Sequence, residues 1–361
     1  MNKKYLKSVL LVLLLVDINQ ITNAAPMILD LNALSTKYKL KNDIPARVQW
    51  DANSGYCGEV SMISAGLYYG QYLSQYDVRG IASPGVPQNL SDSQLLVGVN
   101  DDVAAKGLRL KYERKSSASS SSFYAWVKYH ISLGHPVVTG VFLNQNQDDE
   151  SDLDQGSDEY DHIVPVIGFG SDRPFVNSYY PGDVIIFSDN GLDNDNPYYS
   201  LEIQEFLANR QEANNPDGSA YYLPKDPIIK YGIAITGVMD NKNETLPVIV
   251  TTSKNTESPE MIDNDTKRPM ASTFDLTVTV SKLVPNINYN LYLYSQETDV
   301  PVESFNVNSK KIGVLPWQVI KITSGSKWSK TIKNVKSNSK VIFRAVKADP
   351  STVIRTKSKV R

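Results

Sequence analysis

The sequence predicts an α+β domain over residues 25–245, followed by an all-β domain over residues 246–361. Helical and β-branched patterns alternate in the first part. A polar, proline-containing stretch at residues 252–272 separates the two parts, and short strands with period-two alternation dominate after it. The chain has 361 residues, a length typical of two domains.

The first 24 residues have the pattern of a signal peptide. Basic residues at 3, 4 and 7 precede the unbroken apolar run 9–16, and Ala24 ends a small-residue cleavage site. The run is too short to span a bilayer, and no other stretch of the sequence is long and apolar enough to do so. We therefore expect a secreted or periplasmic protein that has no stable membrane anchor.

A helix is predicted to begin near Cys57, because apolar residues recur at helical spacing after it and Asn53 and Ser54 are good helix-start residues. Further helices are expected at residues 91–106, 123–133 and 201–208. Strands are expected at residues 108–114, 137–143, 163–170, 183–187 and 231–238. A serine-rich loop is predicted at residues 116–122 and an acidic loop at residues 148–161.

Strands in the second part are expected at residues 274–280, 289–294, 318–322 and 341–346. Their spacing predicts a β-sandwich. The first part carries an excess of acidic side chains and the second an excess of basic ones. This asymmetry fits two differently solvated surfaces, docking of the two parts, or a cell-surface or polymer ligand for the second part. The basic residues are dispersed and form no nucleic-acid-binding motif, so no nucleic-acid partner is expected.

The only cysteine of the chain is Cys57, so no intramolecular disulfide can form. Secreted proteins usually pair their cysteines, which leaves three readings of a lone thiol: a small buried hydrophobe, an intermolecular bridge, or a reactive group. A thiol at a helix N-terminus feels a partial positive potential that favours the thiolate. Cys57 is therefore the candidate nucleophile.

A thiolate nucleophile needs an imidazole partner, and the chain has three histidines. His130 falls within a predicted helix and His135 in the turn after it, and both are expected to be surface residues. His162 begins a strand directly after the acidic loop. The end of a buried strand is a good place to fix an imidazole, so His162 is the candidate base.

The histidine in turn needs a group that orients its second nitrogen. If the strand at 183–187 pairs beside the His162 strand, Asp189 or Asn190 reaches the imidazole. Asp189 is the first candidate and Asn190 the reserve, with a solvated turn as the alternative for both. The oxyanion formed by thiolate attack also needs donors, and the Gln49 side chain could supply one together with the Cys57 N–H.

These pieces together resemble the papain-like cysteine peptidases over residues 45–240. The motifs are Gln49, a helix opened by Gly55-Tyr56-Cys57-Gly58, a strand that begins at Asp161-His162 and ends at Gly170, and a following strand that ends in Asp and Asn. The compact spacing of Cys57 and His162 is most similar to the bacteriocin-processing, double-glycine type. The C-terminal strands resemble fibronectin-type or immunoglobulin-like sandwich modules.

The resemblance implies that Cys57 is the nucleophile and His162 the general base and acid. Asp189 or Asn190 would orient the histidine, and Gln49 would donate to the oxyanion. It also implies a peptide or protein substrate and no cofactor. Two alternatives remain open at this point: a catalytically silent scaffold that acts in binding or adhesion, and a cysteine acyl transferase or amidase. The acidic stretches 148–161 and 189–196 do not match the helix-loop-helix calcium signature, so no metal is expected.

Overall fold

The computed structural model describes residues 36–50, 53, 55–147, 157–174, 178–190, 198–254 and 272–349. The predicted signal peptide, most of both acidic stretches and most of the polar stretch 252–272 lie outside these residues. Within the described part of the chain, no helix has the length and apolar character needed to cross a membrane.

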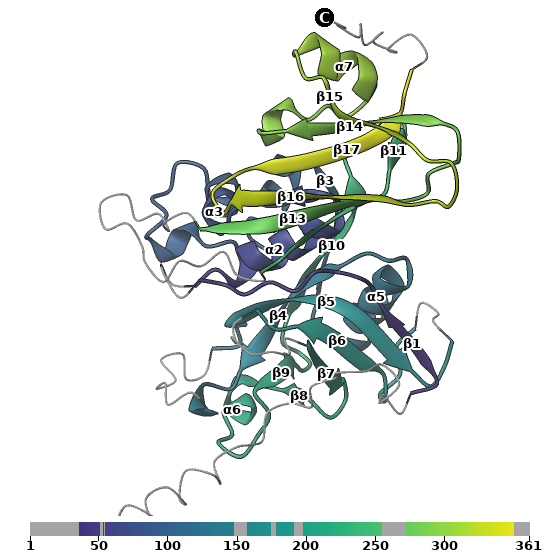
Figure 1. Ribbon diagram of the computed structural model, residues 1–361. Helices are drawn as coiled ribbons and strands as arrows, with labels where there is room; N and C mark the ends of the chain where they lie inside the picture. Colours follow the sequence, from purple (N-terminus) through teal and green to yellow (C-terminus); the bar gives the residue numbers. More distant parts are fainter. Residues whose placement is uncertain are drawn as a thin grey trace, which may run out of the picture.

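A nine-stranded sheet forms the centre of the first part (Figure 1). Its main path runs in the order β3 (Leu110–Ser117), β10 (Lys230–Val238), β4 (Val137–Leu143), β5 (His162–Ser171), β6 (Val184–Ser188), β7 (Tyr198–Glu202). Off this path, β1 (Tyr38–Lys41) pairs with β5, and β9 (Tyr221–Pro224) pairs with β4 and β8 (Leu207–Ala208). Only the β8–β9 pair is parallel among these described strands. The predicted α+β class is confirmed at this level.

The described helices are α2 (Cys57–Tyr68), α3 (Gln75–Ala82), α4 (Asp101–Gly107), α5 (Ser120–Ser132), α6 (Arg210–Ala213) and α7 (Phe305–Lys311). Short 3₁₀ turns lie at Ser91–Ser93, Gln145–Gln147 and Glu297–Asp299. Helix α2 is buried along most of its length. It packs against β5 on one side and β12 (Val248–Thr252) on another, so it lies between the large sheet and the C-terminal strands (Figure 1).

Two smaller antiparallel sheets contain the C-terminal strands. The first has the order β11 (Thr245–Leu246), β17 (Val341–Lys347), β14 (Asn288–Tyr294), β15 (Pro316–Lys321), with β2 (Gln71–Tyr72) added beside β17. The second has the order β12, β13 (Thr273–Val280), β16 (Trp328–Lys336). Strand β13 alternates buried and half-exposed residues, as expected for a sheet with one buried face. A fibronectin-type or immunoglobulin-like topology stays a prediction.

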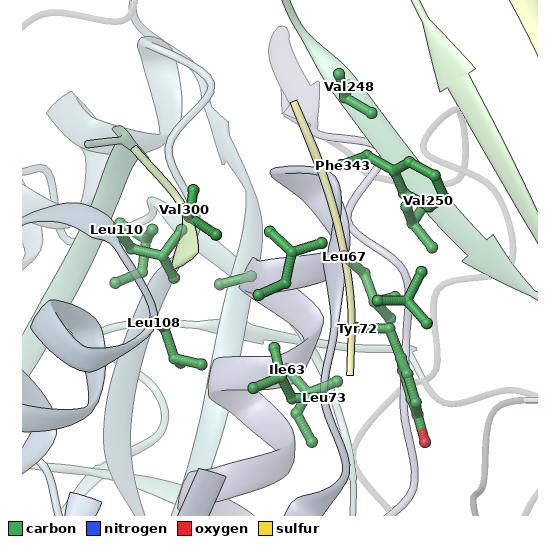
Figure 2. Packing of buried hydrophobic residues seen from close by; sticks show 14 of the residues in the cluster. Ile63, Leu67, Tyr72, Leu73, Leu108, Leu110, Val248, Val250, Val300 and Phe343 are labelled. Carbon is green, nitrogen blue, oxygen red and sulfur yellow. The ribbon is translucent and has the colours of Figure 1, made fainter. Parts of the chain in front are cut away.

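One hydrophobic core crosses the predicted boundary at residue 245 (Figure 2). It joins Ile63 and Leu67 of α2 to Val248 and Val250 of β12 and to Phe343 of β17. The backbone continues this connection, because β2 pairs with β17. Each fully buried aliphatic or aromatic side chain contributes about 1.5–3 kcal/mol. The two predicted parts therefore stabilise each other through a common core.

Most predicted strands of the first part are confirmed within two residues of their ends, but three other elements were wrong. Residues 201–208 form the end of β7, a turn and β8 instead of a helix, because short apolar runs fit either periodicity. Of residues 91–106, only the part from Asp101 onward is α-helical. The serine-rich stretch is not a loop throughout, since β3 extends to Ser117 and α5 begins at Ser120.

Candidate active site

Cys57 is the first residue of α2 and is half-buried. The turn before it needs left-handed backbone at Asn53 (φ 50°) and Gly55 (φ 85°), and glycine adopts that conformation without strain. The predicted side-chain cap is absent among the described residues. Tyr56 occupies the N-cap position without a capping hydrogen bond, and Asn53 donates its amide to Tyr56 Oη at 3.0 Å. Ser54 lies outside the described residues.

His162 begins β5, and Asp189 directly follows β6, the neighbouring strand. The pairing brings His162 Nε2 to 3.4 Å from Asp189 Oδ1, an ion-pair contact between two buried side chains. The Tyr221 ring stacks on the imidazole with 5.6 Å between centroids. Electrostatic interaction with Cys57 also acts on the imidazole of His162. Of the three residues expected to form a triad, His162 and Asp189 are in contact.

Burial and charge act in opposite directions on His162. Burial disfavours the imidazolium, but hydrogen bonds to Asp189 and Cys57 and their negative charges outweigh it and raise the pKa of His162 from 6.5 to about 10. With Nε2 facing Asp189, Nδ1 is the nitrogen left for the thiol. With a pKa of about 10, the imidazole of His162 carries a proton at neutral pH.

Asn190, the reserve candidate for orienting the histidine, faces another way. Its Nδ2 donates to the carbonyl oxygens of Cys57 at 3.1 Å and Ile163 at 2.9 Å, and to Ser61 Oγ at 2.8 Å. These bonds tie the start of α2 to β5. Its backbone oxygen accepts from the Gln49 N–H at 2.7 Å. Asn190 therefore braces the site, while Asp189 faces the imidazole.

Gln49 lies next to the turn that precedes Cys57. Its Oε1 accepts the Tyr56 N–H at 2.8 Å, which leaves Nε2 as a donor that the described residues do not occupy. Gln75 fixes the same segment, because its Oε1 accepts from the Trp50 N–H at 3.0 Å and its Nε2 donates to the Val48 oxygen at 3.1 Å. No sequence pattern indicated Gln75, because its partners are backbone groups far from it in the chain.

His130 and His135 do not join the site. The surface position expected for His130 is wrong, because its side chain is 1 % exposed. Its Nδ1 lies 3.2 Å from His135 Nδ1, and its Nε2 lies 3.4 Å from Glu113 Oε2. Burial lowers the pKa of both histidines. His135 lines a cavity of about 790 Å³ whose walls include neither Cys57 nor His162.

Two further carboxylates near the site have other partners. Asp161, the neighbour of His162, forms an ion pair with Arg210 and accepts the Leu143 N–H at 2.7 Å. Glu59, in the first turn of α2, forms a buried ion pair with Arg79. The available signal for Glu59 was a charged residue on an otherwise uncharged helix. Its partner Arg79 lies on α3, where no local pattern connects the two residues.

A cavity of about 470 Å³ is lined by residues 96–99, 158–160 and 227–229, together with Tyr231, and Cys57 is not among its lining residues. Burial raises the pKa of Tyr160, and Tyr160 and Cys57 pack against the same hydrophobic core. Tyr160 Oη also donates to the Val97 oxygen at 2.7 Å. The sequence analysis did not predict this cavity, which forms from three separate segments.

No three His, Cys, Asp or Glu side chains in the described part of the chain could hold a metal ion together. Of the two acidic stretches considered for calcium, residues 148–156 and 191–196 fall outside that part.

No family model and no curated protein matches the chain. Among solved structures, one match is digestive procathepsin L 3 from the larval midgut of Tenebrio molitor. The match has 13 % sequence identity and a TM-score of 0.30, and it covers 56 % of this chain and 75 % of that one. This likeness is distant in both sequence and geometry, and the double-glycine subtype is not indicated by it.

Proposed function

We propose that this chain is a cysteine peptidase of the papain-like type. The observation that carries the proposal is the 3.4 Å contact of His162 Nε2 with Asp189 Oδ1, together with the electrostatic effect on His162 of Cys57, the first residue of α2. A thiol, an imidazole and an orienting carboxylate in this order are the groups required for thiolate attack on an acyl carbon. The 3.4 Å contact is longer than an aligned hydrogen bond, and such contacts often tighten when substrate binds.

The reaction would begin with the thiolate of Cys57 beside the His162 imidazolium. The sulfur attacks the peptide carbonyl carbon, and His162 gives its proton to the leaving amine, which produces a thioester and a free amine. His162 then takes a proton from water, the hydroxyl attacks the thioester, and the carboxylic acid and thiolate are released. The Cys57 N–H and Gln49 Nε2 would stabilise the oxyanion in both steps.

The cavity lined by residues 96–99, 158–160 and 227–229 supports binding of an apolar substrate side chain. Val99 and Ile229 line it and are exposed at 67 % and 49 %. Exposed apolar groups that line a cavity favour binding of an apolar group. Asp158 and Glu159 line the same cavity and would favour a positively charged group near its rim.

Alkylation of Cys57 and peptide hydrolysis test the proposal directly. We expect iodoacetamide to label Cys57 faster than it labels a free cysteine at neutral pH, and the Cys57→Ala and His162→Ala variants to lose hydrolysis of a peptide library. Addition of amine acceptors to the same assay would reveal acyl transfer through a new amide product. Labelling at the rate of an ordinary buried thiol, with no product from any peptide, would contradict a catalytic role.

Export is a separate proposal that rests on the sequence of residues 1–24. Its test is the N-terminal sequence of the protein recovered outside the producing cell, which we expect to begin at Ala25. Recovery of the unprocessed chain inside the cell alone would contradict it.

A further inference from the structure

A buried ion pair joins Glu59, two residues after Cys57 on α2, to Arg79 of α3. Arg79 Nε is 2.6 Å from Glu59 Oε1, and the two side chains are 0 % and 1 % exposed. Burial raises the pKa of Glu59 and the charge of Arg79 opposes this effect, which shows that desolvation is costly here. Apolar residues of similar volume often replace such pairs without loss of stability. Stability alone is therefore a weak reason for this pair.

Arg79 binds the turn that leads into Cys57. Its Nη1 donates to the Asn53 oxygen at 2.8 Å, its Nη2 donates to the Gly55 oxygen, and its guanidinium lies 3.6 Å from the centre of the Tyr56 ring. These contacts hold a segment whose left-handed backbone would otherwise be free to relax.

One peptide group is held from both ends by this arrangement. The Gly55 C=O and the Tyr56 N–H belong to the same peptide plane, in which they point in opposite directions. The carbonyl accepts from Arg79 and the N–H donates to Gln49 Oε1 at 2.8 Å. Rotation of this plane would break both bonds, so Arg79 also fixes which way the Gln49 amide faces.

Glu59 binds the segment that leads into the cavity. Its Oε1 accepts the Leu95 N–H at 3.0 Å, directly before the lining residues 96–99. The segment approaches α2 closely, because a Cβ at Gly58 would lie 2.0 Å from the Leu95 oxygen. Arg79 adds a bond to the Gln88 oxygen at 3.3 Å. The same ion pair thus contacts the turn before Cys57 and the residue that directly precedes one wall of the cavity.

We propose that Glu59 and Arg79 are positioning residues that hold the Cys57 turn, the Gln49 amide and the cavity wall in one fixed arrangement. The catalytic consequence rests on the proposed peptidase function, whereas the positioning itself does not. A bound peptide would meet the thiolate, the oxyanion donor and the cavity in a geometry set by a single ion pair. Misplacement of about 1 Å in such an arrangement lowers the rate about 100-fold.

The test compares two double variants of the full chain. Glu59→Met with Arg79→Met replaces the pair by apolar side chains that make none of these backbone contacts. Lys128→Met with Asp183→Leu is the matched control, since that ion pair is equally buried, at 0 % and 1 %, has a 2.9 Å contact, and touches neither the Cys57 turn nor residues 95–99. The single variant Arg79→Lys keeps the charge but has one nitrogen to serve several carbonyls.

Amide hydrogen exchange and peptide kinetics are the readouts, with urea unfolding to match the variants in stability. We expect the Glu59/Arg79 variant to exchange the Tyr56 and Leu95 amides at least tenfold faster than the control does. We expect its kcat to fall about 100-fold with a smaller change in KM, and Arg79→Lys to restore part of kcat.

Equal exchange at Tyr56 and Leu95 in the two double variants would overturn the positioning role, and so would an equal fall in kcat at matched stability. If the double variant does not fold, Arg79→Lys carries the same comparison of amide exchange against Lys128→Met. If the unmodified protein cleaves no peptide, the proposed function fails, while the exchange measurements still decide whether the pair holds the two segments.

Discussion

Asp189 Oδ1 lies 3.4 Å from His162 Nε2, and the residue after it, Asn190, turns its amide to the other side of the same strand end. The two residues directly follow β6, and their side chains have different partners, so one strand end serves two purposes. Asp189 sets the charge state of the imidazole, and Asn190 holds the helix that carries Cys57.

Asp189→Asn is expected to lower kcat/KM by at least 100-fold, by analogy with the loss of an orienting carboxylate in serine hydrolases. The amide removes one of the two groups that raise the pKa of His162 to about 10. The imidazolium should then lose its proton at lower pH, and the alkaline limb of the rate profile should move down. The pH dependence of kcat/KM measures both effects, and an unmoved alkaline limb would contradict the assignment of Asp189.

The pH dependence of stability provides an independent check on His162. Its pKa is raised in the folded state, from 6.5 to about 10, so the folded protein binds this proton more tightly than the unfolded chain does. The resulting stabilisation is complete below pH 6.5 and is lost as the pH rises toward 10.

Cys57→Ala lacks one of the two groups that raise the pKa of His162. We therefore expect the free energy of unfolding to fall more steeply between pH 6.5 and 10 in the unmodified protein than in this variant. Urea unfolding across this range measures the two slopes. Parallel slopes would show that Cys57 and His162 are not coupled.

Asn190→Ala should reduce stability and activity together. The variant leaves the buried Ile163 oxygen without this donor and removes the link from β5 to the Cys57 oxygen. Because Ser61 Oγ still donates to both oxygens, we expect a loss of about 0.5–1.5 kcal/mol for each hydrogen bond removed. We also expect an unchanged alkaline limb, which distinguishes this variant from Asp189→Asn. Urea unfolding and a pH–rate profile provide both measurements.

Gly98→Ala should impair substrate binding more than the rate of the chemical step. Gly98 has a φ of 88°, and a Cβ there would lie 2.5 Å from Tyr231 Cδ1, so the cavity wall must move. Cys57 and His162 are not displaced directly. We expect KM to rise about tenfold for peptides with a large apolar side chain, with a smaller change in kcat. Gly85→Ala is the control, since it has a similar φ of 82° but open space around its Cβ.

Sequence patterns were sufficient to predict the positions of candidate residues that lie at the start or end of a single helix or strand. Cys57 and His162 could be predicted from a helix start and a strand start, and the end of the next strand predicted Asp189. The ion pair of Glu59 and Arg79 could not be predicted in this way, because it joins two helices through contacts with irregular backbone. Residues 201–208 were mistaken for helix for a related reason: a short apolar run does not reveal that Leu201 and Glu202 pair with β6 and that β8 pairs with β9.

The division at residue 245 stays a prediction. Composition changes there, but composition does not show that Leu67 of α2 and Val250 of β12 belong to one hydrophobic core. The pairing of β2 with β17 joins residues that are far apart in the sequence. Such contacts depend on tertiary packing and leave no periodic signal in either segment.

The shared core predicts that the two parts unfold together. Leu67→Ala removes a fully buried side chain that packs against the same core as Val250 and Phe343. A loss of about 2–5 kcal/mol is expected for such a truncation. Because the core is common, the loss should appear equally in probes placed in the large sheet and in the C-terminal strands, as in a two-state transition.

A chain that ends at residue 245 should not fold, since it leaves the Leu67 face of α2 exposed. Circular dichroism shows whether the truncated chain folds. Urea unfolding of Leu67→Ala, monitored by amide exchange in β5 and β14, measures the coupling of the two parts. Two separate transitions, with only one shifted by the variant, would instead show two independent domains.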